Sequence, residues 1–340
     1  MPAILVTGGA GYIGSHSAKA LAASGHRVVV YDDLSAGHAE AVQALVARFG
    51  GDAVAFERGN IRETDRLRDA IRRHRIDAAM HFAAWLSVGE SVKDPIGYYR
   101  NNVLGALSVL EAMASERVRS FVFSSTAAVF GNPVETPIDE DHPTRPINAY
   151  GETKLAVERA LPHFERAYGV RSVVLRYFNA AGADPEGDLG EDHDPEQHLI
   201  PLALAATDGG APLQVFGEDY PTPDGTCLRD YIHVSDLADA HLLALSHLAA
   251  GGAPASYNLG NGRPTSVRQV IEAVERVTAR RVSWRPAPRR EGDPAVLFAS
   301  SAKIKRDLGW HPQYEDIDTI VRTAAAWRAG HPRGFAGRAR

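Results

Sequence analysis

The sequence reads Thr7-Gly8-Gly9-Ala10-Gly11-Tyr12-Ile13-Gly14 directly after the short apolar run Ala3–Val6. This segment matches the pattern G-x-G-x-x-G through Gly9, Gly11 and Gly14. Glycines at this spacing allow a tight turn from strand to helix, close approach of the backbone to a pyrophosphate, and close packing of the helix on the strand. The positive end of the helix dipole then favours an anion. The segment therefore predicts a nucleotide-binding turn.

Outward from this turn, β-branched apolar runs alternate with helical patterns as far as residue 178. The expected strands are Ala3–Thr7, Arg27–Tyr31, Val54–Glu57, Ala78–Phe82, Ser120–Ser124 and Ser172–Tyr177. The expected helices are Tyr12–Ala23, Ala39–Phe49, Thr64–His74, Tyr98–Ser115 and Tyr150–Tyr168. Several strands are apolar on both faces, as in a parallel sheet whose crossover helices cover both sides. The pattern predicts a doubly wound α/β sheet of the Rossmann type.

The pattern changes after residue 178. Two stretches, 179–198 and 217–230, are rich in Gly, Pro, Asp and Glu and read as long loops, which are usually functional in a compact domain. The helices expected beyond them are Leu199–Thr207, Val234–Leu248, Val267–Thr278 and Ile317–Ala329. We expect a Rossmann domain over 1–178 and a smaller α/β substrate lobe over most of 179–330, with some segments returning to the first domain. Residues 331–340 read as a frayed tail.

Composition excludes several classes of protein. The 340 residues are 44% apolar and 23% charged, which argues against disorder, collagen and coiled coils. A net charge of -5 disfavours a nucleic-acid partner, and the chain lacks an export signal and a run of about 18 apolar residues for a membrane span. A single Cys227 favours a reducing compartment, so we expect the cytoplasm. The 14 histidines show no H-E-x-x-H or comparable spacing, so no metal is expected.

An acidic pair follows the second expected strand. Asp32 stands 18 residues after Gly14, with Asp33 beside it. A carboxylate at this point can accept hydrogen bonds from the adenosine ribose hydroxyls and would repel a 2′-phosphate. The acidic pair predicts NAD rather than NADP.

A candidate acid–base group opens the helix after the fifth strand. Tyr150 and Lys154 are separated by four positions and therefore share one helical face. An unperturbed phenol has a pKa of about 10, and a cation about 4 Å away at an effective dielectric near 20 contributes roughly 4 kcal/mol. We therefore expect Lys154 to lower the pKa of Tyr150 toward neutrality. Thr126, in the Ser124-Ser125-Thr126 run, can bond the same substrate oxygen.

Together these features resemble the extended short-chain dehydrogenase/reductase superfamily. Further motifs are similar to those of the UDP-glucose 4-epimerase family and run in order from residue 3 to about 325. They are Gly8–Ser15, Gly89–Ser91, Asn101-Asn102-Val103, Arg176–Asn179, Gly190–Asp192, Phe216–Thr222, Asp224-Gly225-Thr226, Arg229–Val234, Tyr257–Gly260 and Ala287–Asp293.

The resemblance implies a reaction. Tyr150 would take the proton of the hexose C4 hydroxyl, Thr126 would share that hydrogen bond, and Lys154 would bind the nicotinamide ribose. The C4 hydride would pass to NAD and return to the other face of a 4-keto sugar, interconverting UDP-glucose and UDP-galactose without net redox. The family also implies a homodimer through the helices Tyr98–Ser115 and Tyr150–Tyr168.

The resemblance also implies the binding residues. Those for NAD are Gly8, Gly11, Tyr12, Ile13, Gly14, Asp32, Asp33, Asn60, Ile61, Phe82, Ala83, Ala84, Asn101, Ser124, Tyr150, Lys154 and Tyr177. Those for the UDP-sugar are Thr126, Tyr150, Asn179, His198, Leu199, Phe216, Arg229, Tyr231, Arg290 and Asp293. Arg229 and Arg290 would clamp the diphosphate, which suits the guanidinium fork, and Asp293 would hold the uridine ribose. Without the resemblance, Arg289-Arg290-Glu291 is interpreted rather as a solvated charge cluster, and the family match reverses this preference.

Four positions depart from the family pattern, and for one of them, Ser300 in place of the usual acid, we have no physical explanation. Asn60 replaces a common aspartate near the adenine, and we expect little loss from this change. Leu86 stands where some members have a lysine, which leaves open how tightly NAD is retained. Leu297 stands where some members have a tyrosine, and the smaller side chain leaves room for an N-acetyl group.

Other functions remain as alternatives. Epimerases of UDP-N-acetylhexosamine or UDP-pentose stay open. A 4,6-dehydratase is disfavoured, because Ala127-Ala128 follows Thr126 where that subfamily has an Asp-Glu pair. A non-catalytic NAD-sensing regulator would need neither Tyr150 nor Lys154.

Overall fold

A computed structural model describes residues 1–290 and 293–337 of the chain. Glu291 and Gly292 of the Ala287–Asp293 motif lie outside the described residues, as does the end of the expected tail, 338–340.

The main sheet has seven strands in the order β11-β6-β5-β4-β1-β2-β3, and every neighbouring pair is parallel. Its strands are β1 (Ala3–Thr7), β2 (Arg27–Asp32), β3 (Val54–Arg58), β4 (Ala78–His81), β5 (Ser120–Thr126), β6 (Arg171–Tyr177) and β11 (Ala255–Leu259). In the centre, Val6 is in register with Val30 on one side and with Met80 on the other. The predicted doubly wound parallel sheet is confirmed.

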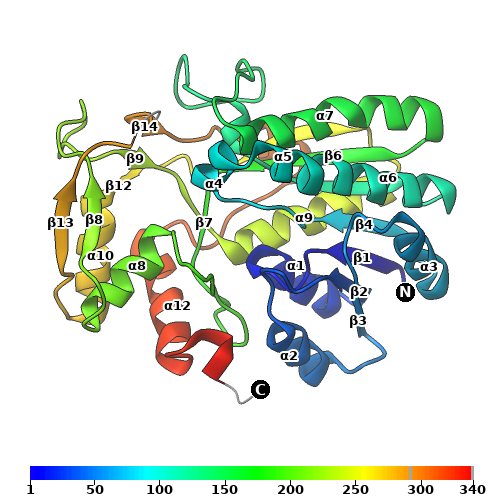
Figure 1. The fold of residues 1–340 in the computed structure, drawn as a ribbon, viewed down its shortest axis with the longest axis horizontal. Coiled ribbons are helices and arrows are strands. Elements are labelled where there is room, and N and C mark those ends of the chain that lie inside the picture. Colours follow the sequence, from blue (N-terminus) through cyan, green and yellow to red (C-terminus); the bar gives the residue numbers. More distant parts are fainter. Residues whose placement is uncertain (291–292, 338–340) are drawn as a thin grey trace.

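Helices cover both faces of this sheet (Figure 1). One face packs against α1 (Tyr12–Ala23), α2 (Ala39–Phe49) and α9 (Val234–Ala249). The other face packs against α3 (Thr64–His74), α6 (Gly105–Ser115) and α7 (Ala149–Tyr168). Along β1, Ile4 and Val6 point to the first layer and Leu5 to the second, which is why the strand is apolar throughout. Across residues 1–290 and 293–337, no helix is both long and apolar enough to cross a membrane.

The seventh strand was not predicted. β11 pairs with β6, in register Tyr257 to Leu175, and α9 lies on the same face of the sheet as α1. The polar residues Ser256 and Asn258 interrupt the apolar pattern, and the pairing partner is some 80 residues away in the chain. Segments after residue 178 therefore complete the cofactor-side sheet.

The remaining elements form a second lobe beside the carboxyl ends of the main strands, at the left of Figure 1. Its core contains α8 (Leu199–Thr207), β8 (Leu213–Phe216), α10 (Val267–Thr278) and α12 (Ile317–Gly330). Its other strands are β7 (Asn179–Ala181), β9 (Leu228–Arg229), β10 (Tyr231–His233), β12 (Thr265–Ser266), β13 (Trp284–Ala287) and β14 (Val296–Leu297). Helix α11 (Ala302–Leu308) contacts the main-sheet side.

The helix expected over Tyr98–Ser115 is divided into several pieces. It starts at the last residue of α5 (Pro95–Tyr98), which follows α4 (Val88–Lys93), and continues as a π-helix, η1 (Tyr99–Leu104), before α6 begins. The wider turn buries Asn102, whose side chain accepts a hydrogen bond from Trp85 N at 2.8 Å and donates to Thr153 Oγ1 at 3.1 Å. Such π-turns are frequent at functional sites.

The expectation of a frayed tail from residue 331 is wrong as far as residue 337. A short helix, η3, spans Gly334–Gly337, and Phe335 is only 5% exposed. Its ring lies 5.0 Å from that of His38 and 5.4 Å from that of Trp327, and its N–H donates to Asp192 at 2.8 Å. One aromatic side chain with these partners is sufficient to hold a segment whose composition is otherwise polar.

Candidate active site

A cavity of about 300 Å³ opens at the carboxyl ends of the central strands, where ligands of such sheets bind. Most of the predicted site residues line it. They are Gly8, Gly11, Tyr12, Ile13, Gly14, Asp32, Asp33, Ile61, Phe82, Ala83, Ala84, Asn101, Ser124, Thr126, Tyr150, Lys154, Tyr177, Asn179 and His198. The structure thus brings the glycine turn, the acidic pair and the Tyr-Lys pair to one cavity.

The glycines of the turn have different reasons to lack a side chain. Gly8 has φ +74°, and a Cβ there would lie 2.5 Å from Ala83 N, while a Cβ on Gly14 would lie 2.2 Å from Gly8 O. A Cβ on Gly11 would meet its nearest neighbour at 3.4 Å, an ordinary contact. Because Gly11 is the N-cap of α1 and lines the cavity, its missing side chain leaves the helix N-terminus open to an anion.

The acidic pair is fixed by the backbone. Asp32 accepts hydrogen bonds from Ala10 N at 3.1 Å and Leu34 N at 2.8 Å; burial raises its pKa, and these bonds oppose the shift. Asp33 accepts from Asn60 Nδ2 at 2.7 Å. Asn60 itself is not among the cavity-lining residues, although it was expected to touch the cofactor. Its contact with Asp33 makes it a support for that carboxylate.

The Tyr150-Lys154 pair sits in the first turns of α7, which begins after Asn148 and places both residues over β5. The Asn148 side chain caps the helix by accepting from Gly151 N at 2.9 Å. Lys154 Nζ donates to the Ser124 carbonyl at 2.9 Å, and burial lowers the pKa of Lys154 to about 7. Burial raises the pKa of Tyr150, and a hydrogen bond with Thr126 opposes the rise. The pKa of Tyr150 is therefore not lowered in the protein alone, because the desolvation penalty, which the expected effect of Lys154 did not include, is the largest contribution.

A second layer holds this pair in place. The hydroxyls of Ser124 and Tyr177 are hydrogen-bonded, and burial raises the pKa of Tyr177. Ser125 donates to Glu158 Oε1 at 2.5 Å, and the Arg176 guanidinium donates to both Glu158 oxygens, the shortest contact being 2.6 Å. These bonds join β5, α7 and β6 below the cavity.

Several lining residues were not predicted. They include the loop Ser35–Gly37 and Gly59, and Glu191 and His193, which form part of the cavity wall near Tyr12. Leu86 and Trp85 also line the cavity, Trp85 being 41% exposed. The only signal for the loop was its position directly after Asp33 at a strand end.

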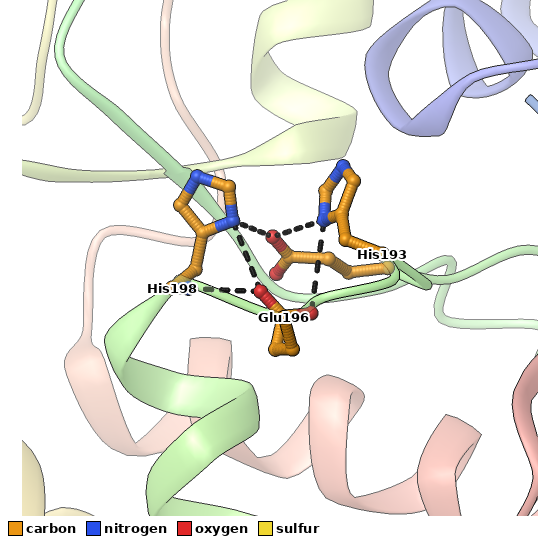
Figure 2. A group of neighbouring side chains, drawn as sticks. His193, Glu196 and His198 are labelled. Carbon is orange, nitrogen blue, oxygen red and sulfur yellow. Dashed lines mark hydrogen bonds and ion pairs between the residues drawn. The ribbon is translucent and has the colours of Figure 1, made fainter. Parts of the chain in front are cut away.

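Four side chains between β7 and α8 meet at this wall, and we call them the loop cluster: Glu191, His193, Glu196 and His198. Figure 2 shows the two imidazoles turned toward the carboxylates. Nδ1 of His198 lies 2.8 Å from Glu191 Oε1 and 3.2 Å from Glu196 Oε1. The carboxylates raise the pKa of His193 to about 9 and that of His198 to about 10 against the opposing effect of burial.

Six residues expected to bind the UDP-sugar lie beyond the cavity lining, in or at the edge of the second lobe: Leu199, Phe216, Arg229, Tyr231, Arg290 and Asp293. Arg229 forms an ion pair with Asp293. The Arg290 guanidinium lies 4.0 Å from the centre of the Phe216 ring. Arg229 and Arg290, the two residues expected to bind the diphosphate, thus each contact another side chain of this chain.

Comparison with known proteins identifies the family. Residues 4–260 match the NAD-dependent epimerase/dehydratase family. The UDP-glucose 4-epimerase of Halalkalibacterium halodurans is 51% identical over 98% of this chain and 97% of its own length. The chain belongs to the UDP-glucose 4-epimerase family.

Solved epimerases of this family have the same fold. The UDP-glucose 4-epimerase of Brucella ovis in complex with NAD has a TM-score of 0.91 and 50% identity, over 96% of this chain and 98% of its own. That of Bifidobacterium longum in complex with NAD⁺ and UDP has a TM-score of 0.92 and 37% identity, over 98% and 99%. The likeness includes both the main sheet and the second lobe.

Proposed function

We propose that this protein is an NAD-dependent epimerase that interconverts UDP-glucose and UDP-galactose at C4 through a transient 4-keto sugar, without net redox. The observation that carries the proposal is the single cavity in which Tyr150, Lys154 and Thr126 face the glycine turn and the acidic pair. Membership of the UDP-glucose 4-epimerase family supports the same reaction.

The cavity fits NAD. The open N-terminus of α1 at Gly11 suits the pyrophosphate, and Asp32 with Asp33 suits an unphosphorylated adenosine ribose. Lys154 is the candidate for the nicotinamide ribose. When bound, NAD supplies reversible hydride transfer.

The chain's own part in the chemistry is proton transfer at the sugar C4 oxygen. Tyr150 Oη would hold that proton, and Thr126 would share the hydrogen bond. Because burial alone raises the pKa of Tyr150, the phenol becomes a better base only when positive charge enters the cavity. Lys154, held by the Ser124 carbonyl, is one such charge when protonated.

The second lobe would select the nucleotide. Arg229 and Arg290 would bind the diphosphate, because two guanidinium groups match its oxygens. Phe216 would pack near uracil and Asp293 would hold the uridine ribose. The other contacts expected for the UDP-sugar come from Asn179, His198, Leu199 and Tyr231.

A second substrate class is favoured by one position. Leu297 lies in β14 and packs against the same apolar cluster as Phe178, which lines the cavity. A leucine leaves more room there than the tyrosine of some family members. UDP-N-acetylhexosamine or a UDP-pentose is therefore the alternative substrate.

We further infer a homodimer in the cytoplasm. Exposed apolar side chains gather on α4, α5 and η1, including Val92 at 66% and Ile96 at 63% exposure. Such a patch next to the expected α6–α7 contact is typical of an interface. The single Cys227 is free and buried, which suits a reducing compartment.

The function is tested by incubating the purified protein with UDP-galactose, first without added cofactor and then with NAD, and analysing the nucleotide sugars. We expect UDP-glucose to form. If none forms even with NAD, the epimerase is refuted; NAD binding without turnover would then favour a sensing role. Conversion of UDP-N-acetylgalactosamine in a parallel reaction tests the alternative.

A further inference from the structure

Apart from the expected contact of His198 with the UDP-sugar, the loop cluster has no part in the function proposed above, yet it borders the cavity. Glu191, His193 and His198 are lining residues. The ring of Tyr12, in the first turn of α1, lies edge-on 6.2 Å from that of His193. An ion held by this cluster would therefore adjoin both the cavity and the N-terminus of α1.

The donor atoms of the cluster already have nearly the spacing of a tetrahedral metal site. Besides the two contacts of His198, Nδ1 of His193 lies 3.4 Å from Glu191 Oε1 and 3.7 Å from Glu196 Oε2. With metal bonds of about 2.0–2.1 Å, neighbouring donors in a tetrahedron lie about 3.3–3.4 Å apart. The four nitrogen–oxygen distances, from 2.8 to 3.7 Å, lie on both sides of this value, and they include both carboxylate oxygens of Glu196. One ligand atom from each of the four residues lies within 4.8 Å of the others.

Two of the atoms that could bind a metal in this cluster make no well-aligned hydrogen bond to the described residues. The Glu191 side chain is 6% exposed. Its buried Oε1, and the buried Nδ1 of His193, make no well-aligned hydrogen bond to any described residue, although Oε1 forms ion pairs with Nδ1 of His198 at 2.8 Å and Nδ1 of His193 at 3.4 Å. Both atoms nevertheless point at the other cluster members (Figure 2 for His193). Buried polar groups normally have hydrogen bonds, so these two atoms suggest a missing ligand.

A second acidic group in the structure provides a contrast. Asp184, Glu186 and Asp188 are also close together, but Lys19 Nζ lies within 2.6–2.9 Å of all three. Arg48 adds contacts of 2.6 and 2.8 Å. That group holds the ammonium of Lys19 and the guanidinium of Arg48, which cannot themselves bind a metal, whereas the cations of the loop cluster are its own imidazolium rings, whose nitrogens become metal ligands when zinc displaces their protons.

We propose that the loop cluster binds one Zn²⁺ ion. Two imidazole nitrogens and two carboxylate oxygens are a donor set that zinc accepts and that Mg²⁺ and Ca²⁺, which prefer oxygen alone, do not. With neutral imidazoles, the two carboxylates balance the charge of a divalent ion. The spacing Glu191, His193, Glu196 and His198 is not H-E-x-x-H, so the sequence did not predict a metal.

The test uses the full chain with its bound nucleotide, stripped of metal by a chelator. Isothermal titration with ZnCl₂, with elemental analysis of the dialysed product, should show one ion per chain and a Kd in the micromolar range or below. An excess of Mg²⁺ should not compete. Glu196→Gln and His193→Gln should each weaken binding at least tenfold, while Glu186→Gln, in the contrasting group, should not change it.

Zinc binding that is absent, or that is equal in the variants and the wild type, overturns the proposal. Thermal melting of each variant shows that it is folded. A useful independent readout is the melting temperature, which zinc should raise in the wild type and in Glu186→Gln but not in Glu196→Gln, since a ligand specific for the folded state stabilises it.

The effect on catalysis rests on the proposed function. Because His198 is among the expected substrate contacts, zinc should lower kcat/KM of the wild type, and Glu196→Gln should lose this inhibition relative to its own zinc-free rate. A protein that binds zinc at the cluster but never epimerises overturns the proposed function and leaves the site intact. An active enzyme whose zinc binding does not depend on the loop cluster supports the proposed function and overturns the zinc site.

Discussion

The guanidinium of Arg229 is paired with the carboxylate of Asp293, and the Arg229 side chain is only 11% exposed. Arg229 lies in β9, between β12 and β14, so both its backbone and its head group are fixed. A guanidinium held in this way pays little ordering entropy when it binds an anion.

Arg229→Ala should therefore raise KM for UDP-galactose by about 10- to 100-fold and change kcat only a few-fold. The lost charge-assisted hydrogen bonds are worth roughly 1.5–3 kcal/mol and act equally on ground state and transition state. Steady-state kinetics measures the effect. The control is Arg281→Ala, whose side chain is 92% exposed and, among the residues that the structure describes, forms an ion pair with Glu275 alone. A fall in kcat at unchanged KM would contradict the assignment.

Tyr150→Phe should lower kcat by at least about 10²-fold, because a general acid–base group contributes about 10²–10⁴. UDP binding, measured by titration, should stay within about threefold of wild type. Tyr168→Phe, on the same helix and 58% exposed, is the matched control and should be active. Wild-type turnover in Tyr150→Phe would remove this residue from the mechanism.

Lys154→Met should abolish most turnover without lowering the melting temperature. Burial lowers the pKa of Lys154 from 10.5 to about 7, so keeping its charge costs the fold free energy that an apolar chain of similar length does not. Lys19→Met is the control. The Lys19 ammonium has three carboxylate partners, so its loss should lower the melting temperature. Calorimetry on both variants decides between these expectations.

The helices that the sequence predicted best carry local signals. Helices α1, α2, α3, α8 and α10 have the expected bounds to the residue, and α10 has a Ser266–Gln269 capping box. Long-range pairing explains what was missed. β11 exists because β6 offers it an edge, and Phe335 is held by His38, some 300 residues earlier. Neither interaction can be read from a short window of sequence.

The residues of the candidate site also divide into those with a local sequence signal and those brought together only by the fold. Gly11, Asp32 and Tyr150 have fixed spacings to a strand or helix end, and all three line the cavity. Glu191 and His193 lie in an irregular loop, where only the three-dimensional path of the chain brings their donor atoms together. The Arg229–Asp293 pair joins residues 64 positions apart, and the sequence assigned both residues to the ligand rather than to each other.

His241 should make stability depend on pH in the acid range. Its ring lies 4.7 Å from Phe82 and 6.2 Å from Tyr177, and burial lowers its pKa to about 4. In the unfolded state the imidazole of His241 binds a proton below about pH 6.5, whereas in the folded state it binds one only as the pH approaches about 4. The contribution of His241 to the free energy of unfolding is therefore complete above pH 6.5 and is lost as pH falls through this window.

The measurement is urea unfolding of wild type and His241→Leu at pH 7.5, 6 and 5. The variant should lose less stability with acid, by about 1.4 kcal/mol per pH unit between pH 6 and 5. The other buried histidines with lowered pKa values, His16, His81 and His233, are common to both proteins and cancel in the comparison. Parallel pH curves would contradict the expectation.

Leu297→Tyr should narrow the substrate range. Leu297 packs against the same apolar cluster as the cavity-lining Phe178, and the larger ring should take up the space that we propose for the acyl group, so kcat/KM for a UDP-N-acetylhexosamine should fall at least tenfold relative to UDP-galactose. The ratio of the two values in one preparation is the readout, since it cancels differences in active fraction. An unchanged ratio would show that another residue limits the acyl group.

Both β11 and α9 follow the nucleotide-binding motifs in the chain, and this order limits where the protein can be truncated. Truncation after Tyr177 would leave β6 as a bare edge strand and strip Leu237, Ala244 and Leu248 from the apolar layer over β1. The nucleotide-binding half is therefore not a transplantable module, although its motifs are contiguous in the gene. During synthesis, the sheet therefore lacks its seventh strand until the chain has been made as far as Leu259, where β11 ends.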